Sequence, residues 1–247
     1  MIGHRGVAAQ APENTLAGLR RAKELGCRWV EFDVRLTADG MPILLHDDRL
    51  ERTTNGFGDS AALPLAAVRK YDAGGWFGPS FIGERIPTLE ETVAALAALG
   101  LGANVELKAA RGRAAATGRA AAELLARLWP TQLPAVLVSS FLETALMAAR
   151  EVAPQLARGL LFRSVPRDWR ARVEALGCRT VHADHRRLHP AIVAEIRNCG
   201  YPVLAYTVND AARAAMLYSW GVASVFSDIP HLLIDASSAG TRPGTAS

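Results

Sequence analysis

Two acidic residues, Glu31 and Asp33, stand two positions apart in a run of alternating apolar and polar residues, 29–36. The aromatic and β-branched residues of this run predict a strand, on which residues i and i+2 point to the same face. Adjacent carboxylates repel each other and raise each other's pKa values unless a cation lies between them. Carboxylate oxygens suit Mg²⁺ or Ca²⁺ better than zinc. The alternative is a solvated acidic face that pairs with arginines.

Three further residues that can do chemistry stand at or near the ends of expected strands. His4 follows a very short first strand, His46 ends an extended piece, and Glu106 lies in the next strand. If these strands are neighbours, the three side chains converge with Glu31 and Asp33. Packing three carboxylates together favours one divalent metal between them, which leaves the two histidines free to move protons near neutral pH.

Positively charged and aromatic residues accompany this set. Arg5 and Lys108 add positive charge beside the expected metal, and arginine is suited to binding phosphate through two hydrogen bonds. Lys108 shares a strand face with Glu106, so its alternative role is to neutralise that carboxylate. Phe141 and Tyr206 follow or end expected strands and are candidate pocket walls.

Strands and helices alternate along the chain. The expected strands after the first are 29–36, 103–108, 136–139, 156–161, 180–182, 203–208 and 224–226. The first expected helix ends near Leu25, and the later ones cover 88–99, 112–128, 142–152, 167–176, 190–199, 210–220 and 230–236. Asn14 is the expected N-cap of the first helix. About eight such units in 247 residues predict a closed (β/α)₈ TIM barrel. The alternative is an open doubly wound sheet, although the chain lacks its usual Gly-rich nucleotide loops.

Residues 47–87 interrupt this alternation with a long, Gly-rich insertion between the second and third barrel strands. Loops of this length are usually functional, as lids or binding surfaces. Trp76 and Phe77 within it form either a substrate cover or the loop's own small core. We expect one catalytic TIM-barrel domain over residues 1–236, followed by a disordered tail rich in Ser, Gly and Thr over 237–247.

Composition limits the class of protein. Half of the residues are hydrophobic, and 28 Lys and Arg against 24 Asp and Glu give a net charge of +4. This mild excess fits an anionic small molecule and gives no argument for nucleic acid or membrane binding. Three scattered cysteines predict buried thiols in a reducing compartment. With neither a charged-then-apolar leader nor an apolar run of membrane-spanning length, we expect a cytoplasmic protein without stable membrane association.

Three histidines, His182, His185 and His189, are close in the sequence. Their spacing is loose for a zinc site, and a surface loop after the sixth strand is the expected alternative. His182, at the end of a strand, could still line the barrel mouth.

Ten short motifs occur in order along nearly the whole chain. They are His4-Arg5-Gly6, Pro12-Glu13-Asn14-Thr15, Glu31-Phe32-Asp33-Val34, Asp39-Gly40, His46-Asp47, Pro87-Thr88-Leu89, Glu106-Leu107-Lys108, Ser139-Ser140-Phe141, Tyr206-Thr207-Val208-Asn209 and Ser227-Asp228-Ile229-Pro230. This ordered set resembles the glycerophosphodiester phosphodiesterases, and the segment after His46 resembles the insertion of that family. The family often has Trp at the place of Tyr206 and usually Thr at that of Ser227.

The resemblance implies a TIM-barrel hydrolase that splits a glycerophosphodiester into sn-glycerol 3-phosphate and an alcohol with one Mg²⁺ or Ca²⁺. It implies metal ligands at Glu31, Asp33 and Glu106, acid/base catalysis by His4 and His46, and phosphate contacts from Arg5 and Lys108. The smaller aromatic wall at Tyr206 concerns substrate preference more than activity.

Two other functions remain as alternatives. A phospholipase D-like enzyme acting on lysolipids or sphingolipids would have an apolar membrane-facing surface. A non-catalytic phosphodiester or RNA binder would show a steep loss of binding with salt, but it has no need of paired acid/base groups. The sequence leaves open the preferred alcohol, the physiological metal, the oligomeric state and whether the insertion moves as a lid.

Overall fold

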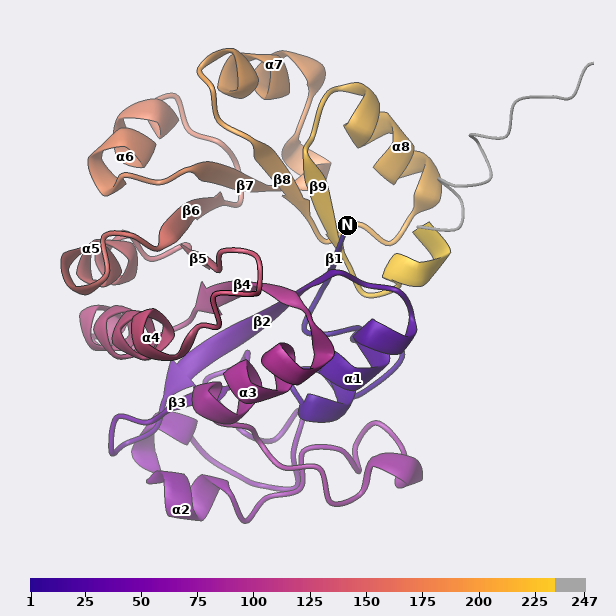
Figure 1. The fold of residues 1–247 in the computed structure, drawn as a ribbon, viewed down its shortest axis with the longest axis vertical. Coiled ribbons are helices and arrows are strands. Elements are labelled where there is room, and N and C mark those ends of the chain that lie inside the picture. The colour runs from indigo at the N-terminus through magenta and orange to yellow at the C-terminus, as the bar shows by residue number, and fades with distance from the viewer. Residues whose placement is uncertain (234–247) are drawn as a thin grey trace, which may run out of the picture.

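The computed structural model describes residues 1–233, and within this range eight parallel strands form a closed sheet (Figure 1). These barrel strands are β1 (Ile2–Gly3), β2 (Trp29–Leu36), β4 (Gly102–Leu107), β5 (Leu137–Ser140), β6 (Ala157–Phe162), β7 (Thr180–Asp184), β8 (Val203–Tyr206) and β9 (Ser224–Ser227). The sheet closes because Gly3 of β1 is in register with Val30 of β2 and with Ser227 of β9. The predicted TIM barrel is confirmed, and the open-sheet alternative is wrong.

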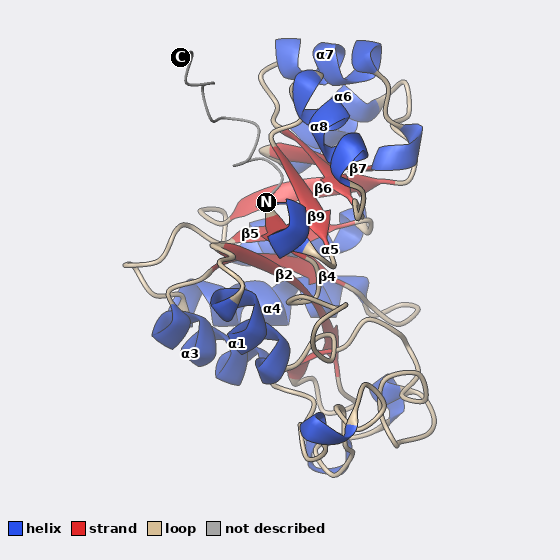
Figure 2. Ribbon diagram, turned by 90° about the vertical axis from the view of Figure 1, so that its right-hand side faces the viewer, coloured by secondary structure: helices blue, strands red, loops and turns tan. Residues whose placement is uncertain are grey.

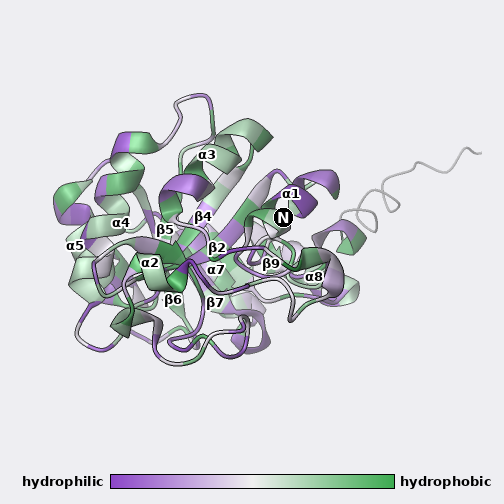
Figure 3. Cartoon of the chain, turned by 90° about the horizontal axis from the view of Figure 1, so that it is seen from below, coloured by the Kyte–Doolittle hydropathy of each residue, from purple (hydrophilic) through white to green (hydrophobic). Residues whose placement is uncertain are grey.

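Helices follow the strands and cover the outside of the barrel (Figure 2). They are α1 (Leu16–Glu24), α3 (Leu89–Leu99), α4 (Ala114–Leu128), α5 (Glu143–Val152), α6 (Trp169–Leu176), α7 (Pro190–Asn198) and α8 (Ala211–Ser219). Hydrophobic and hydrophilic stretches alternate along these helices, as one buried face requires (Figure 3). None of the helices in residues 1–233 has the length and apolarity needed to cross a bilayer.

The last expected helix is described only in part. Residues 230–233 are helical, whereas the remainder of 230–236 and the expected disordered tail, 237–247, lie outside the described residues.

The two faces of strand β2 differ: one packs into the hydrophobic core, and the other carries the two acidic residues. Val30, Phe32 and Val34 are fully buried on its outward face, in the main hydrophobic cluster with residues of the surrounding helices. Glu31 and Asp33 take the opposite face, as alternation along a strand requires. The hydrophobic face therefore fixes the direction of the two carboxylates.

The segment between β2 and β4 carries a small core of its own. It contains the strand β3 (Pro42–Leu44), which runs antiparallel to β2, the 3₁₀ turns η1 (Ser60–Ala62) and η2 (Pro79–Phe81), and the short helix α2 (Leu65–Val68). Its buried cluster consists of Ile43, Leu45, Leu50, Val68, Ala73 and Ile86. The part around α2 lies to one side of the barrel (Figures 1 and 2).

The aromatic residues of this segment stack on one another. The ring centroids of Trp76 and Phe77 lie 5.6 Å apart, and those of Phe77 and Phe81 lie 5.4 Å apart, both edge to face. Neither Trp76 nor Phe77 is among the residues that line the cavities at the barrel mouth. Trp76 is exposed and neither residue belongs to the buried cluster of the segment, so the structure bears out neither the substrate cover nor the loop's own small core.

The two N-cap expectations have different outcomes. Thr88 and Glu91 form the full capping box of α3. The first helix, however, is capped by Thr15, whose side chain accepts a hydrogen bond from Gly18 N. The prediction of Asn14 as N-cap is wrong, because the side chain of Asn14 is bonded to Asp33 instead.

Helices α4 and α5 approach each other closely at Gly118. A Cβ atom at this position would lie 2.1 Å from the backbone oxygen of Ala145. The absence of a side chain at Gly118 therefore sets the distance between two neighbouring helices of the barrel wall.

We expect Gly118→Ala to destabilise the fold. Overpacking against backbone costs about 1–3 kcal/mol, only partly offset by the about 1 kcal/mol that alanine gains over glycine in a helix. Because a 2.1 Å approach to a backbone oxygen belongs at the upper end of this cost, urea unfolding should show a net loss of about 1–2 kcal/mol. Gly78→Ala is the control, because its Cβ would meet open space. Equal stability of the two variants would contradict close packing at Gly118.

Candidate active site

A cavity of about 220 Å³ opens at the carboxyl-terminal ends of the barrel strands. All of the site residues predicted from the sequence line it, except Asp33. Those lining it are His4, Arg5, Glu31, His46, Glu106, Lys108, Phe141 and Tyr206. Residues expected to converge from separate strands therefore share one cavity, at the end of the barrel where TIM-barrel enzymes carry out their chemistry.

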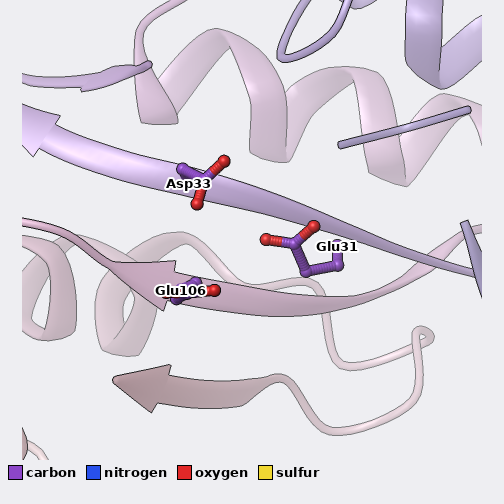
Figure 4. Close-up of side chains that lie close together, drawn as sticks. All are labelled: Glu31, Asp33 and Glu106. Atoms are coloured by element: carbon purple, nitrogen blue, oxygen red, sulfur yellow. The ribbon is translucent and has the colours of Figure 1, made fainter. Parts of the chain in front are cut away.

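Three carboxylates meet beside this cavity. Glu31 and Asp33 project from β2, and Glu106 projects from the adjacent β4, where it is in register with Asp33 (Figure 4). One oxygen from each lies within 4.8 Å of the others, and all three residues are buried. The structure thus brings together the three predicted metal ligands at a spacing that one ion can bridge.

The negative charge of these carboxylates is not fully compensated by the neighbouring residues. Burial and the charge of Asp33 raise the pKa of Glu31 to about 8, and the same two causes raise the pKa of Glu106. Burial also acts to raise the pKa of Asp33, but Lys108 and Arg5 outweigh it and lower that pKa. Among the described residues, the buried Glu31 Oε1 has no hydrogen-bond partner. A divalent cation at this place would give the unpartnered oxygen a partner and would favour the ionised form of the carboxylates.

Two basic side chains border the acidic cluster. Arg5 Nε lies 3.4 Å from Asp33 Oδ2. Lys108 Nζ lies 3.6 Å from Asp33 Oδ1 and 2.6 Å from Glu106 Oε1. Lys108 therefore does neutralise Glu106, while it also lines the cavity. Both cations are placed where an anionic group beside the carboxylates would meet them.

His4 is held by a carboxylate from the far end of the chain. Its Nδ1 donates to Asp228 Oδ1 at 2.6 Å, and its Nε2 lies 3.9 Å from Glu31 Oε2. Asn209 Nδ2 in turn donates to Asp228 Oδ2 at 2.6 Å. Burial acts to lower the pKa of His4, but Asp228 and Glu31 outweigh it and raise that pKa. The bond at Nδ1 fixes the ring and leaves Nε2 facing the acidic cluster.

His46 has a similar partner of its own. Its Nδ1 donates to Asp47 Oδ1 at 2.6 Å, and Arg52 Nε donates to Asp47 Oδ2 at 2.5 Å. Arg52 also binds Glu13, which accepts a hydrogen bond from Arg5 as well. Burial lowers the pKa of His46. A chain of charged pairs therefore ties the start of the insertion to the turn after β1.

The turn after β1 has an unusual backbone. Arg5 and Asn14 are the non-glycine residues of the described chain with positive φ, at 50° and 56°. Asn14 Nδ2 donates to Asp33 Oδ2 at 2.9 Å, and Asp33 N donates to Asn14 Oδ1 at 3.0 Å. Arg5 N donates to Glu31 Oε2 at 2.9 Å. Such backbone strain persists where surrounding contacts over-determine it, and here those contacts hold the acidic cluster.

Aromatic residues form the opposite wall. The rings of Phe141 and Tyr206 lie 5.8 Å apart and edge to face, and Lys108 Nζ lies 5.6 Å from the centre of the Phe141 ring. The hydroxyl of Tyr206 donates to the Phe162 backbone oxygen at 2.7 Å. This bond fixes the ring and holds its hydroxyl against the end of β6.

The sequence pattern did not predict Asp228 or His182 as residues of the site. Asp228 belongs to one of the ten motifs, but no local pattern links it to His4, which lies 224 positions away. His182 was expected at the end of the strand 180–182, with a place at the barrel mouth as one possibility; it lies inside β7, is fully buried and lines the cavity. The apolar residues beside it, Val181 and Ala183, were a signal for a strand that extends through it.

Comparisons with known proteins identify the family. The sequence matches the Glycerophosphoryl diester phosphodiesterase family over residues 4–232. The chain belongs to this family. This confirms the family and the class of enzyme predicted from the ordered motifs, a glycerophosphodiester phosphodiesterase.

Other members of the glycerophosphoryl diester phosphodiesterase family are similar over nearly their full length. The chain is 33% identical to a glycerophosphodiester phosphodiesterase of Caldanaerobacter subterraneus subsp. tengcongensis, over 95% of this chain and 96% of the relative. It is 31% identical to one of Bacillus subtilis, over 94% and 84%. A solved Oleispira antarctica phosphodiesterase, in complex with the product sn-glycerol-3-phosphate, has 42% identity and a TM-score of 0.93, with 96% of both chains covered.

We expect a divalent cation to stabilise the wild-type protein and not the Glu31→Gln variant. At 100 times its Kd, a bound ion adds about 2.7 kcal/mol, which raises Tm by roughly 5–10 °C in a domain of this size. Gln keeps the acceptor for Arg5 N but removes the charge that would bind the ion. Thermal unfolding in EDTA and in excess Mg²⁺ or Ca²⁺ measures the difference.

The control for this experiment is Glu123→Gln, which changes an exposed carboxylate of α4. It should keep the full increase in Tm. An equal increase in the Glu31→Gln variant would mean that the ion binds elsewhere.

Proposed function

We propose that this enzyme hydrolyses glycerophosphodiesters to sn-glycerol 3-phosphate and an alcohol in the cavity at the barrel mouth. The observation that carries the proposal is the convergence, on one cavity, of a three-carboxylate cluster and two histidines that each donate to a carboxylate. The product in the Oleispira antarctica structure agrees with this reaction, since that chain is similar over 96% of its length.

One Mg²⁺ or Ca²⁺ held by Glu31, Asp33 and Glu106 completes the site in this proposal. The donors are hard oxygens, the ligand type that both ions prefer. When bound, the ion would polarise the phosphoryl group and make the glycerol 2-hydroxyl more acidic. The unpartnered Glu31 Oε1 supports a role for this residue as a ligand.

The two histidines are proposed as the acid/base pair. In both, Nδ1–H donates to a carboxylate, which leaves Nε2 as the atom that exchanges a proton with the substrate. As the glycerol 2-oxygen attacks phosphorus, one histidine removes its proton and the other protonates the departing alcohol oxygen. Water then opens the cyclic phosphate with the two roles reversed, which restores both histidines.

Substrate contacts follow from the remaining lining residues. Arg5 and Lys108 are proposed to bind the phosphate oxygens, because both basic groups border the carboxylates and face the cavity. Phe141 and Tyr206 are proposed to pack against the organic part of the substrate, since their edge-to-face rings form a rigid apolar wall.

We expect the purified protein to release glycerol 3-phosphate from glycerophosphocholine in the presence of Mg²⁺ or Ca²⁺ and to lose this activity in EDTA. An enzyme-coupled assay for glycerol 3-phosphate measures both states, and added metal should restore the rate. Full activity in EDTA would contradict the metal requirement, and release of phosphocholine instead of glycerol 3-phosphate would contradict the proposed bond cleavage.

Replacing His46 with Ala should lower kcat by roughly 10²–10⁴-fold, the usual contribution of general acid/base catalysis. Metal-induced stabilisation should remain, because His46 is not a proposed ligand. His189→Asn is a matched control: His189 is an exposed N-cap outside the cavity, and Asn also caps helices well. A near-wild-type rate in His46→Ala would remove His46 from the mechanism.

A further inference from the structure

A second hollow, of about 580 Å³, adjoins the cavity on the side away from the acidic cluster. It is lined by Phe141, Arg163, Asp184, Arg186, Arg187 and Tyr206. Phe141, Arg163 and Tyr206 also line the inner cavity, so the two spaces share one wall. These residues come from the segments that end or follow β5, β6, β7 and β8, whereas the acidic cluster belongs to β2 and β4.

The charge of this outer hollow is positive. Its one acidic residue, Asp184, is already neutralised, because Arg186 donates to both of its carboxylate oxygens at 3.0 and 2.7 Å. Arg163 and Arg187 are exposed and form no ion pair with any residue in the range 1–233. Two guanidinium groups without a carboxylate partner therefore face a space that a ligand can enter.

The arrangement of the two spaces assigns them to different parts of a substrate. The phosphodiester must reach the carboxylates and histidines of the inner cavity. The inner cavity, at about 220 Å³, suits the small glycerol moiety, which every substrate of this class shares. The larger and more open outer hollow is the place for the alcohol, the part that varies among substrates.

We propose that the enzyme prefers glycerophosphodiesters whose alcohol carries an additional anionic group, phosphate or carboxylate, which Arg163 and Arg187 bind. This inference rests on the proposed function. Guanidinium groups bind such oxyanions with paired, charge-assisted hydrogen bonds. A cationic alcohol such as choline would instead meet like charge at the same place.

Two matched pairs of substrates test the proposal. Glycerophosphoinositol 4-phosphate differs from glycerophosphoinositol by one phosphate, and glycerophosphoserine differs from glycerophosphoethanolamine by one carboxylate. For each pair, the ratio of kcat/KM for the more anionic substrate to that for its partner is measured. We expect both ratios to exceed one and to fall as salt screens the charges. The larger ratio identifies the preferred anion.

Variants connect this preference to the two arginines. Arg163→Ala and Arg187→Ala should each lower both ratios by about 2- to 5-fold, as expected for an exposed ion pair, and Arg163→Glu should lower them further. Arg127→Ala, at an exposed position near the end of α4, should leave them unchanged. Because each ratio is taken within one variant, a partly unfolded preparation does not alter it.

The outcomes separate this proposal from the reaction itself. Ratios at or below one in the wild type, or ratios that the arginine variants leave unchanged, would overturn the anionic preference even if every substrate is cleaved. The absence of glycerol 3-phosphate release from all four substrates and from glycerophosphocholine would instead overturn the proposed function, and this inference with it.

Discussion

The burial of three carboxylates within 4.8 Å of one another is the constraint on which this structure depends. Removing such charges from water is costly, and their mutual repulsion adds to that cost. The chain compensates locally, because Arg5 and Lys108 lie beside Asp33 and the strained turn after β1 directs a backbone N–H at Glu31. The charge that remains uncompensated is the physical basis of the divalent cation proposed for this cluster.

The compensation extends outward in two branches of hydrogen-bonded polar and charged side chains. One runs from His4 to Asp228 and Asn209. The other runs from His46 through Asp47 and Arg52 to Glu13. Both branches fix a histidine through its Nδ1 atom, so the groups that hold the rings in place also leave Nε2 as the free nitrogen of each ring. In the proposed mechanism, electrostatic balance and the orientation of the acid/base pair therefore depend on the same contacts.

Alternation along the sequence was sufficient to predict much of this arrangement. The period of two in β2 separates Glu31 and Asp33 from the hydrophobic face, and the alternation of strands and helices predicts the barrel. Such local patterns do not predict hydrogen bonds between residues that are far apart in the sequence. Asn14 is a residue type typical of N-caps, yet its side chain donates to the buried carboxylate of Asp33, which needs a donor, while the next residue, Thr15, caps the helix. Arg163 carried no local signal, since only the closed barrel places it beside Phe141 and Tyr206.

The strand that closes the barrel, β1, has a consequence for how the enzyme folds. β1 has two residues and pairs with β9, and His4 meets a partner 224 positions away. On the ribosome, synthesis must pass Asp228 before that pair can form, whereas β2 and β4 have been available far earlier. Ring closure over such a separation is entropically slow. Catalytic competence should therefore appear as one of the last events of folding, and a nascent chain would hold its acidic cluster before it could turn over any substrate.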